Sequence, residues 1–235
     1  MAEHWFHTPA IPHEGELVEL DAQESSHATR SRHLEPGKEI VLSDGAGTTA
    51  RALLKDARRR GASALVVERT LHPTPARRIH LACALPKGDR LSTLLSMATQ
   101  LGMTDFTPLV ARRSVVQPGA ETPERWQRVV REACKQSRRP WQPVIHSPAS
   151  PAESAESAGA SARVLLMDRA GEPMTNLLGP SPGDCLVLVG PEGGFDDEEI
   201  AELSEAGARP CALARGILRI ETAAAAALAA LALSE

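Results

Sequence analysis

The second part of the chain alternates short apolar runs with helical patterns, and this alternation constrains the fold more than any other feature. The apolar runs occupy residues 79–85, 106–111, 164–167, 186–189 and 211–214. Strands that are apolar on both faces and separated by helices are typical of a parallel sheet covered on both sides. We therefore predict an α/β fold for this part of the chain.

Helices are predicted between these runs. Leucines and an alanine recur at helical spacing over residues 89–101, and Gly102 follows as a C-cap. Further helices are predicted over residues 122–137, 196–206 and 221–233. Residues 147–161 contain only Ala, Ser, Pro, Glu and Gly, a composition that predicts a loop.

The first part of the chain is predicted to form short strands joined by turns. The strands cover residues 16–20, 39–43, 48–55 and 64–69, and a short helix covers 21–33 with Asp21 as its N-cap. Asp44-Gly45 begins a hairpin turn, because this dipeptide tolerates positive φ. The stretch 72–75 contains two prolines and interrupts regular structure. We predict a small β-barrel-like domain over residues 1–72 and the α/β domain over residues 73–235, an α+β arrangement overall.

The composition is that of a globular protein and argues against several function classes. The chain is 42% hydrophobic and 24% charged, and no run reaches the roughly 18–20 apolar residues of a membrane span. No secretory signal is visible at its start, so the cytoplasm is the expected location. The four cysteines form no C-x-x-C pair, which argues against a zinc site. His4, His7 and His13 lack ligand spacing in a stretch expected to be irregular, so we expect no metal.

The charge of the chain is unevenly distributed. The net charge of −4 and the aromatic content of 3%, with no Tyr, argue against a general single-strand binder that works by stacking. Residues 81–145, however, hold 10 basic and 5 acidic residues, whereas residues 146–235 hold 5 and 14. Local potential, rather than net charge, attracts a polyanion. The basic middle therefore leaves RNA binding open, although charged residues that simply coat helices are the alternative.

A glycine loop follows the predicted strand 186–189. Residues 190–195 read Gly-Pro-Glu-Gly-Gly-Phe, and four acidic residues, 196–199, open the next helix. Glycines after a parallel strand let backbone N–H groups approach a ligand closely. A phosphate cradle would need the Lys and Ser/Thr of the Walker pattern, and the acidic residues would repel phosphate. The loop favours an uncharged or cationic ligand; a tight turn without a ligand is the alternative.

A second segment, residues 213–223, joins the last predicted strand to an Ala-rich helix. Arg219 and Glu221 stand at this junction, where the carboxyl edge of an α/β sheet usually holds a ligand. They are therefore candidate catalytic residues, and an Arg/Glu pair that only caps the helix is the alternative.

A third segment carries basic residues at helical spacing. They are Arg128, Arg131, Lys135 and Arg138. Any one of them is explained by a solvated helix face, but their clustering favours contacts with RNA phosphates.

Taken together, these segments resemble one family. The motif GPEGGF at 190–195, ILR-x-ETA at 217–223, and Arg-Trp followed by Glu-Ala and Gln-Ser-Arg at 125–138 are similar to those of the ribosomal RNA small subunit methyltransferase E family. Lesser matches are Asp44-Gly45, Lys87, Leu101-Gly102 and Arg113-Ser114. The resemblance covers nearly the whole chain in the right order.

The resemblance implies a fold, a reaction and partners. The fold would be a SPOUT-type domain with a trefoil knot behind a PUA-like domain that helps to grip rRNA. The reaction would methylate N3 of a uridine in 16S rRNA of the small ribosomal subunit, with S-adenosylmethionine as cofactor. The protein would be a homodimer, with the cofactor pocket beside the dimer interface. The sulfonium cation of this cofactor suits a glycine loop without lysine.

Candidate residues follow for each role. The cofactor would contact Met167, Gly190, Pro191, Glu192, Gly193, Leu213, Ile217 and Leu218. Arg219 would stabilise the negative charge that develops as uridine N3 loses its proton, and Glu221 would orient Arg219 or take that proton. The RNA would contact Arg30, Arg32, Lys87, Arg113, Arg131 and Arg138.

Two alternatives remain open from the sequence. The same fold could act on another RNA such as tRNA, or the chain could be a non-catalytic RNA-binding ribosome-assembly factor that kept the pocket. Arg219 and Glu221 beside an intact glycine loop favour an enzyme. The absence of Tyr predicts that the target base is held by hydrogen bonds and backbone contacts more than by stacking on a tyrosine ring.

Overall fold

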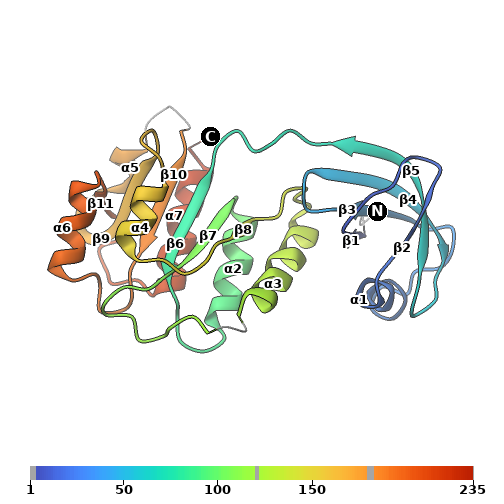
Figure 1. The fold of residues 1–235 in the computed structure, drawn as a ribbon, viewed down its shortest axis with the longest axis horizontal. Coiled ribbons are helices and arrows are strands. Elements are labelled where there is room, and N and C mark those ends of the chain that lie inside the picture. Colours follow the sequence, from blue (N-terminus) through green and yellow to red (C-terminus); the bar gives the residue numbers. More distant parts are fainter. Residues whose placement is uncertain (1–3, 120–121, 179–182, 235) are drawn as a thin grey trace. The chain divides into compact units, whose positions relative to one another are not determined.

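The computed structural model describes residues 4–119, 122–178 and 183–234, which form two compact units (Figure 1). The first unit comprises the chain up to Thr74 together with Arg131–Gln142, and the second comprises Pro75–Val130 and Pro143–Glu235. Helix α3 (Thr122–Ser137) spans the predicted helix and contributes residues to both units. The domain boundary after residue 72 stays a prediction, and the first unit adds a segment from the middle of the chain.

The first unit is built on a five-stranded mixed sheet that curls around its core (Figure 1). The strands are ordered β1 (Trp5–His7), β3 (Glu39–Ser43), β4 (Thr48–Asp56), β5 (Ser63–Leu71) and β2 (Leu17–Glu19). Strands β1 and β3 run parallel, and the other neighbours are antiparallel. Phe6, Leu42 and Leu54 are completely buried beneath the sheet. The predicted small β domain is therefore confirmed.

Strand β1 corrects one expectation, because the stretch that holds the first histidines is not irregular throughout. Trp5, Phe6 and His7 pair in parallel with residues 41–43 of β3. Three residues are too few for an alternating pattern to be recognised, and a parallel partner lies far along the chain. Burial lowers the pKa of His7, and the nearby cations Arg131 and Lys135 add to this effect.

The helical segment of the first unit begins where predicted. Helix α1 (Ala22–Ser26) continues into a π-helical turn, η1 (His27–Ser31). The Asp21 carboxylate accepts a hydrogen bond from the Glu24 backbone N–H at 2.7 Å, so the N-cap is confirmed. The Glu24 carboxylate in turn lies 2.7 Å from Lys135 Nζ, and both side chains are buried. This ion pair ties the end of α3 to α1.

The second unit contains a six-stranded sheet in which every neighbouring pair is parallel. The order is β11 (Arg209–Ala212), β9 (Arg163–Pro173), β10 (Cys185–Val189), β6 (Ile79–Ala84), β7 (Asp105–Leu109) and β8 (Val144–Ile145). The predicted parallel α/β sheet is confirmed. The short strand β8 was not predicted, because two residues carry no periodicity.

Helices cover both faces of this sheet (Figure 1). Helix α2 (Arg90–Gln100) packs against α7 (Ile220–Ala232), which lies on β6 and β10. Helices α4 (Pro151–Ser157) and α6 (Asp197–Glu205) pack together beside a cluster that includes Leu186 and Leu188 of β10. The short helix α5 (Met174–Leu177) follows β9. Alternate residues of β10 thus serve opposite faces.

Helix α4 corrects the loop expected over residues 147–161. Ser150 Oγ accepts from the Glu153 backbone N–H, and the Glu153 carboxylate accepts from the Ser150 backbone N–H. This is a capping box with Pro151 at the start of the helix, a signal that the biased composition hid.

Two further expectations concern features of the whole chain. The trefoil knot stays a prediction. Within the described ranges, no helix is long and apolar enough to cross a membrane.

Candidate functional site

A cavity of about 240 Å³ opens at the carboxyl edge of the parallel sheet, beside β9, β10 and β11. Its walls come from a bulge of β9, the glycine loop after β10, the segment after β11 and the first turns of α7. This edge is where open α/β sheets bind ligands. Of the eight predicted cofactor residues, seven line the cavity: Met167, Gly190, Pro191, Glu192, Leu213, Ile217 and Leu218.

The bulge of β9 places Met167 on the cavity wall. Leu166 pairs with Pro210, but the next paired residue of β9, Glu172, pairs with Cys211, so residues 167–171 leave the ladder. Gly171 allows the strands to close again, because a Cβ there would lie 2.3 Å from the backbone of residues 210 and 211. Asp168 and Arg169 in the bulge also line the cavity.

The glycine loop is shaped by Phe195. This side chain is buried, and a Cβ on Gly190 would lie 2.9 Å from its ring. Gly190 is therefore required for the close approach of the loop to the ring. Gly193 lies outside the cavity lining, although its carbonyl accepts a hydrogen bond from the Arg113 guanidinium at 3.0 Å.

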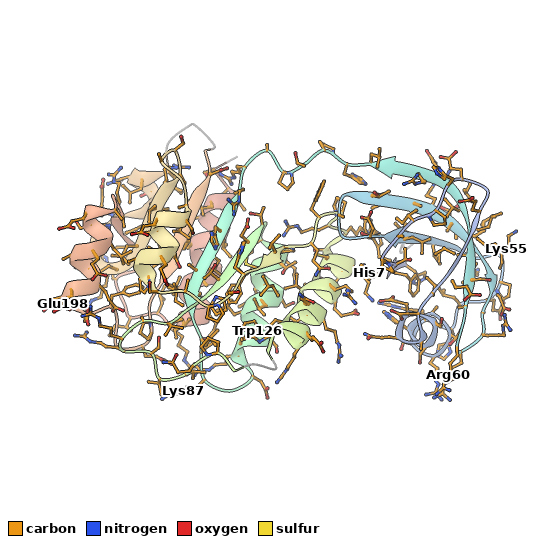
Figure 2. All side chains as sticks on the ribbon, viewed as in Figure 1. His7, Lys55, Arg60, Lys87, Trp126 and Glu198 are labelled. Carbon is orange, nitrogen blue, oxygen red and sulfur yellow. The ribbon has the colours of Figure 1, made fainter. Side chains whose placement is uncertain are left out.

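Arg112 and Arg113 hold the loop and the acidic start of α6. Arg113 also donates to the Phe195 carbonyl at 3.2 Å. The Arg112 guanidinium pairs with Asp196 at 3.2 Å and with Glu198, labelled in Figure 2. Arg113, predicted to bind RNA, is thus engaged with loop carbonyls. The sequence reasoning did not include Arg112, since a partner more than 80 residues away leaves no local signal.

Arg90 is a second residue that sequence reasoning missed. It is the first residue of α2, and its guanidinium lies 3.4 Å from Glu221 and 3.9 Å from Glu192 of the glycine loop. The Glu221 side chain is only 12% exposed, and its Oε2 atom has no partner among the described residues. Arg90 therefore links the glycine loop to α7. In the sequence, the family match at the nearby Lys87 was the only signal that pointed to the start of α2.

Arg219 and Glu221 are not joined to each other. Arg219 is the N-cap residue of α7, and its exposed side chain makes no hydrogen bond or ion pair with a residue that the structure describes. The Glu221 carboxylate instead pairs with Arg90. The orientation of Arg219 by Glu221, one of the two roles considered for Glu221, stays a prediction without a visible contact.

The remaining predicted RNA-binding residues lie in both units. In the first unit, Arg32 and Arg138 line a separate cavity, Arg30 is exposed on η1, and Arg131 is half-buried in α3. In the second unit, Lys87 is exposed after β6 (Figure 2).

The cavity at the carboxyl edge of the sheet suits a cationic ligand with an apolar body. Glu192 and Asp168 line it, Arg169 is the only cation of its described lining, and the rest of that lining carries no charge.

Cys83 lies near the end of β6. Burial raises the pKa of its thiol, and the negative charge of Glu221 raises it further. In the described part of the chain, no group of three or more His, Cys, Asp or Glu side chains could hold a metal ion.

Comparison with known proteins places this arrangement in a family. The model of the RNA methyltransferase domain matches residues 72–232. The ribosomal RNA small subunit methyltransferase E of Mycobacterium tuberculosis is 35% identical over 234 residues, which cover 96% of this chain and 89% of the relative. The chain belongs to the ribosomal RNA small subunit methyltransferase E family. The family member of Synechocystis is also 35% identical, over 90% of this chain and 71% of the relative.

Solved structures of this family share the fold along the full chain. A ribosomal RNA small subunit methyltransferase E from Neisseria gonorrhoeae, bound to S-adenosylmethionine, is 29% identical with a TM-score of 0.89, over 97% of this chain and 96% of that chain. A protein from Legionella pneumophila, also in complex with S-adenosylmethionine, is 26% identical with a TM-score of 0.90, over 98% of this chain and 97% of that chain. The predicted fold class and the family resemblance are therefore confirmed.

Proposed function

We propose that this protein methylates N3 of a uridine in 16S rRNA of the small ribosomal subunit, in the cytoplasm, with S-adenosylmethionine as methyl donor. The observation that carries the proposal is the cavity at the carboxyl edge of β9, β10 and β11. Seven of the residues predicted from the sequence to bind the cofactor line it, within a chain that belongs to a family of rRNA methyltransferases.

The residues present fit this cofactor. The apolar side chains Met167, Leu213 and Leu218 offer a surface for the adenine ring, and Gly190 leaves room beside them. Glu192 and Asp168 supply negative charge, which suits a sulfonium and the ammonium of the methionyl group. When bound, S-adenosylmethionine supplies an electrophilic methyl group.

The chain's own residues have two tasks in the reaction. Uridine N3 must lose its proton as it forms a bond to the methyl carbon, and negative charge spreads over the base as this happens. The exposed Arg219 guanidinium at the start of α7 is proposed to stabilise that charge. Glu221 is proposed to act beside it, as proton acceptor or as the anchor that Arg90 holds in place.

A homodimer is part of the proposal. Ile217 is 84% exposed although it lines the cavity wall, and a large apolar side chain in that position suits a protein interface. A partner covering Ile217 would close the cavity from one side.

The test is mass mapping of 16S rRNA from cells that lack the protein, before and after treatment with the purified protein and S-adenosylmethionine. We expect one N3-methyluridine to be missing and then restored. Methylation of a tRNA instead would identify the alternative substrate. Binding of the cofactor with no methylation of any RNA would identify an assembly factor.

The first variant prediction concerns Arg219. Arg219→Ala should lower kcat by roughly 100-fold or more, the effect of removing one charge-stabilising group, while calorimetry shows cofactor affinity little changed. The side chain has no described partner within the fold, so stability should not fall. Arg215→Ala, a neighbouring exposed arginine, is the matched control. Unchanged turnover in Arg219→Ala would contradict the assignment.

A further inference from the structure

A second cavity, of about 220 Å³, lies entirely within the first unit. Its size is close to the 240 Å³ of the proposed cofactor site. It is bounded by β1, by the η1 segment and by the end of α3. The fold thus brings together three stretches of chain, one of which comes from more than 100 residues downstream.

Two of the six Phe and Trp residues of the chain belong to this cavity. Trp5 is partly exposed at this cavity, whereas the Phe6 side chain is completely buried in the core behind it. His4 and His27 add two imidazole rings, and the Phe6 and His27 rings meet edge to face at 5.7 Å. A wall of this kind suits the flat face of a nucleobase, which RNA-binding proteins hold on aromatic and His rings.

The polar side chains of the cavity complement a nucleotide. The guanidinium groups of Arg32 and Arg138 carry positive charge suited to a phosphate. Gln136 and Glu132 offer amide and carboxylate groups that can pair with a base edge. The Lys135 side chain is 7% exposed, and its ammonium pairs with Glu24 at 2.7 Å and Glu132 at 2.8 Å. Lys135 therefore joins α3 to α1 at the cavity and does not supply charge for a ligand.

Arg138 follows the end of α3 and has a left-handed backbone conformation, which glycine usually adopts at this position. The backbone N–H of Arg139 donates to the Cys134 carbonyl at 2.9 Å, which ends α3, and Arg138 has a φ of 59°. Helices often end on such a left-handed residue, and glycine adopts it without steric cost. The chain instead carries an arginine whose side chain lines the cavity.

We propose that this cavity binds one unpaired nucleotide of the RNA substrate, with its base against Trp5 and its phosphate at Arg32 and Arg138. This nucleotide is separate from the uridine that reacts in the second unit. The inference rests on the proposed function, because it takes the substrate to be RNA. A single aromatic subsite also agrees with the low aromatic content, which argues against stacking along a run of bases.

The environment of His27 favours its neutral form. Burial lowers the pKa of this imidazole, and the charges of Lys135 and Arg32 lower it further against the opposing charge of Glu132. A neutral ring is suited to packing beside a base.

The experiment measures the affinity of the full-length protein for a 16S rRNA transcript at several salt concentrations. Trp5→Ala should weaken binding about 5- to 150-fold, the range for loss of one stacked base, with an unchanged salt slope. Trp5→Phe keeps an aromatic ring and should recover most of the affinity. Arg32→Ala and Arg138→Gly should each reduce the slope of log affinity against log salt by about 0.7, as expected for one lost phosphate contact.

The design contains controls for folding and for general charge. Arg138→Gly keeps the backbone conformation that ends α3, because glycine adopts a positive φ without steric cost, and its thermal midpoint is measured beside its affinity. Arg60→Ala removes one exposed arginine of the same unit from the β4–β5 turn, apart from His7 of β1 in Figure 2. It should reduce affinity less than either cavity arginine variant.

A cross-linking measurement locates the nucleotide directly. A transcript that contains 4-thiouridine is irradiated with the full-length protein, and mass spectrometry identifies the linked peptides. We expect a link to the peptide that holds Trp5 and Phe6, lost in Trp5→Ala and retained in Arg60→Ala. Links that avoid the cavity residues, or equal loss of affinity in Trp5→Ala and Arg60→Ala, would overturn the proposal.

Failure of this inference is distinguishable from failure of the proposed function. If the unmodified protein methylates 16S rRNA and the cavity variants bind it normally, only this inference is wrong. If the cavity variants lose affinity for the transcript but no uridine is methylated, the RNA site stands and the proposed reaction is wrong.

Discussion

Several residues of this protein make their main contacts with residues that are distant in the sequence. Glu221 lies two positions from Arg219, yet its carboxylate pairs with Arg90, at the start of another helix. Gly190 was predicted to let the backbone approach a ligand, yet the structure shows that it also makes room for the ring of Phe195. In each case a partner distant in the chain decides what the residue does.

The ion pair of Arg90 gives the second variant prediction. Arg90→Met should lower the free energy of unfolding by about 1–2 kcal/mol, less than the roughly 3–5 kcal/mol of a fully buried pair, because Arg90 is 35% exposed. It leaves the largely enclosed Glu221 carboxylate without its cation. Affinity for S-adenosylmethionine should also fall, since Arg90 no longer holds the Glu192 carboxylate of the glycine loop in position.

A double variant separates the two effects of Arg90. In Arg90→Met/Glu221→Gln, the enclosed charge is gone, so urea denaturation should show that most of the lost stability returns. Cofactor affinity, measured by calorimetry, should stay low because the Glu192 carboxylate is still not held in position. Additive losses of stability in the double variant would refute the coupling.

Gly47 gives the third prediction, and its basis is a close approach in the first unit. Its φ is 93°, and a Cβ would lie 2.2 Å from the Trp141 ring, whose indole N–H donates to the Pro73 carbonyl at 2.8 Å. Gly47→Ala should therefore destabilise the protein by about 2–4 kcal/mol. Gly37→Ala, with φ 88° and open space around it, isolates the backbone cost and should lose only about 1–2 kcal/mol. Equal losses in a urea titration would exclude the ring contact as the cause.

Elements of the second unit are joined at the amino ends of β6 and β7 by a buried polar cluster. The Asp105 carboxylate accepts from Arg78 at 2.7 Å and lies 2.8 Å from His146 Nε2. Burial alone would raise the pKa of Asp105, but hydrogen bonds from Arg78, His146 and Thr104 outweigh it and lower the pKa to about 2. Burial lowers the pKa of His80, which contacts Thr107 at 2.8 Å, to about 4.

The fourth prediction is that acid weakens this sheet in two steps. His80 is neutral in the fold and protonates more readily in the unfolded chain, so its contribution is full above pH 6.5 and is lost as pH falls to about 4. The loss amounts to about 3 kcal/mol. The contribution of Asp105 is lost next, as pH falls from 3.8 to about 2. His80→Gln should remove the first step in urea titrations at a series of pH values; parallel curves for the two proteins would contradict the assignment.

At the scale of the whole molecule, many of the basic residues counted over residues 81–145 form ion pairs with carboxylates of the same chain. Arg90, Arg112 and Lys135 all face carboxylates. Arg125 pairs with Asp89 at 3.0 Å. The counts of residues 81–145 therefore overstate the positive charge that is available to RNA.

The fifth prediction concerns the proposed homodimer. If Ile217 lies at the interface, Ile217→Lys should convert a dimer to a monomer in light-scattering measurements, because a charge would be buried without a partner. Leu71→Lys changes a side chain that is 78% exposed on β5 of the first unit and is the matched control. A monomeric unmodified protein at micromolar concentration, or a dimer that survives Ile217→Lys, would count against the interface.

The sequence alone determined the class of the fold and the place of the candidate cofactor cavity, because both follow from local patterns. Apolar runs between helices specify a parallel sheet, and the motifs at 190–195 and 217–223 fall at its carboxyl edge. The tertiary structure decided which charges meet. The pairs of Arg90 with Glu221 and of Lys135 with Glu24 join residues more than 100 positions apart. Such pairs depend on strand order and crossovers, which leave no periodicity in the chain.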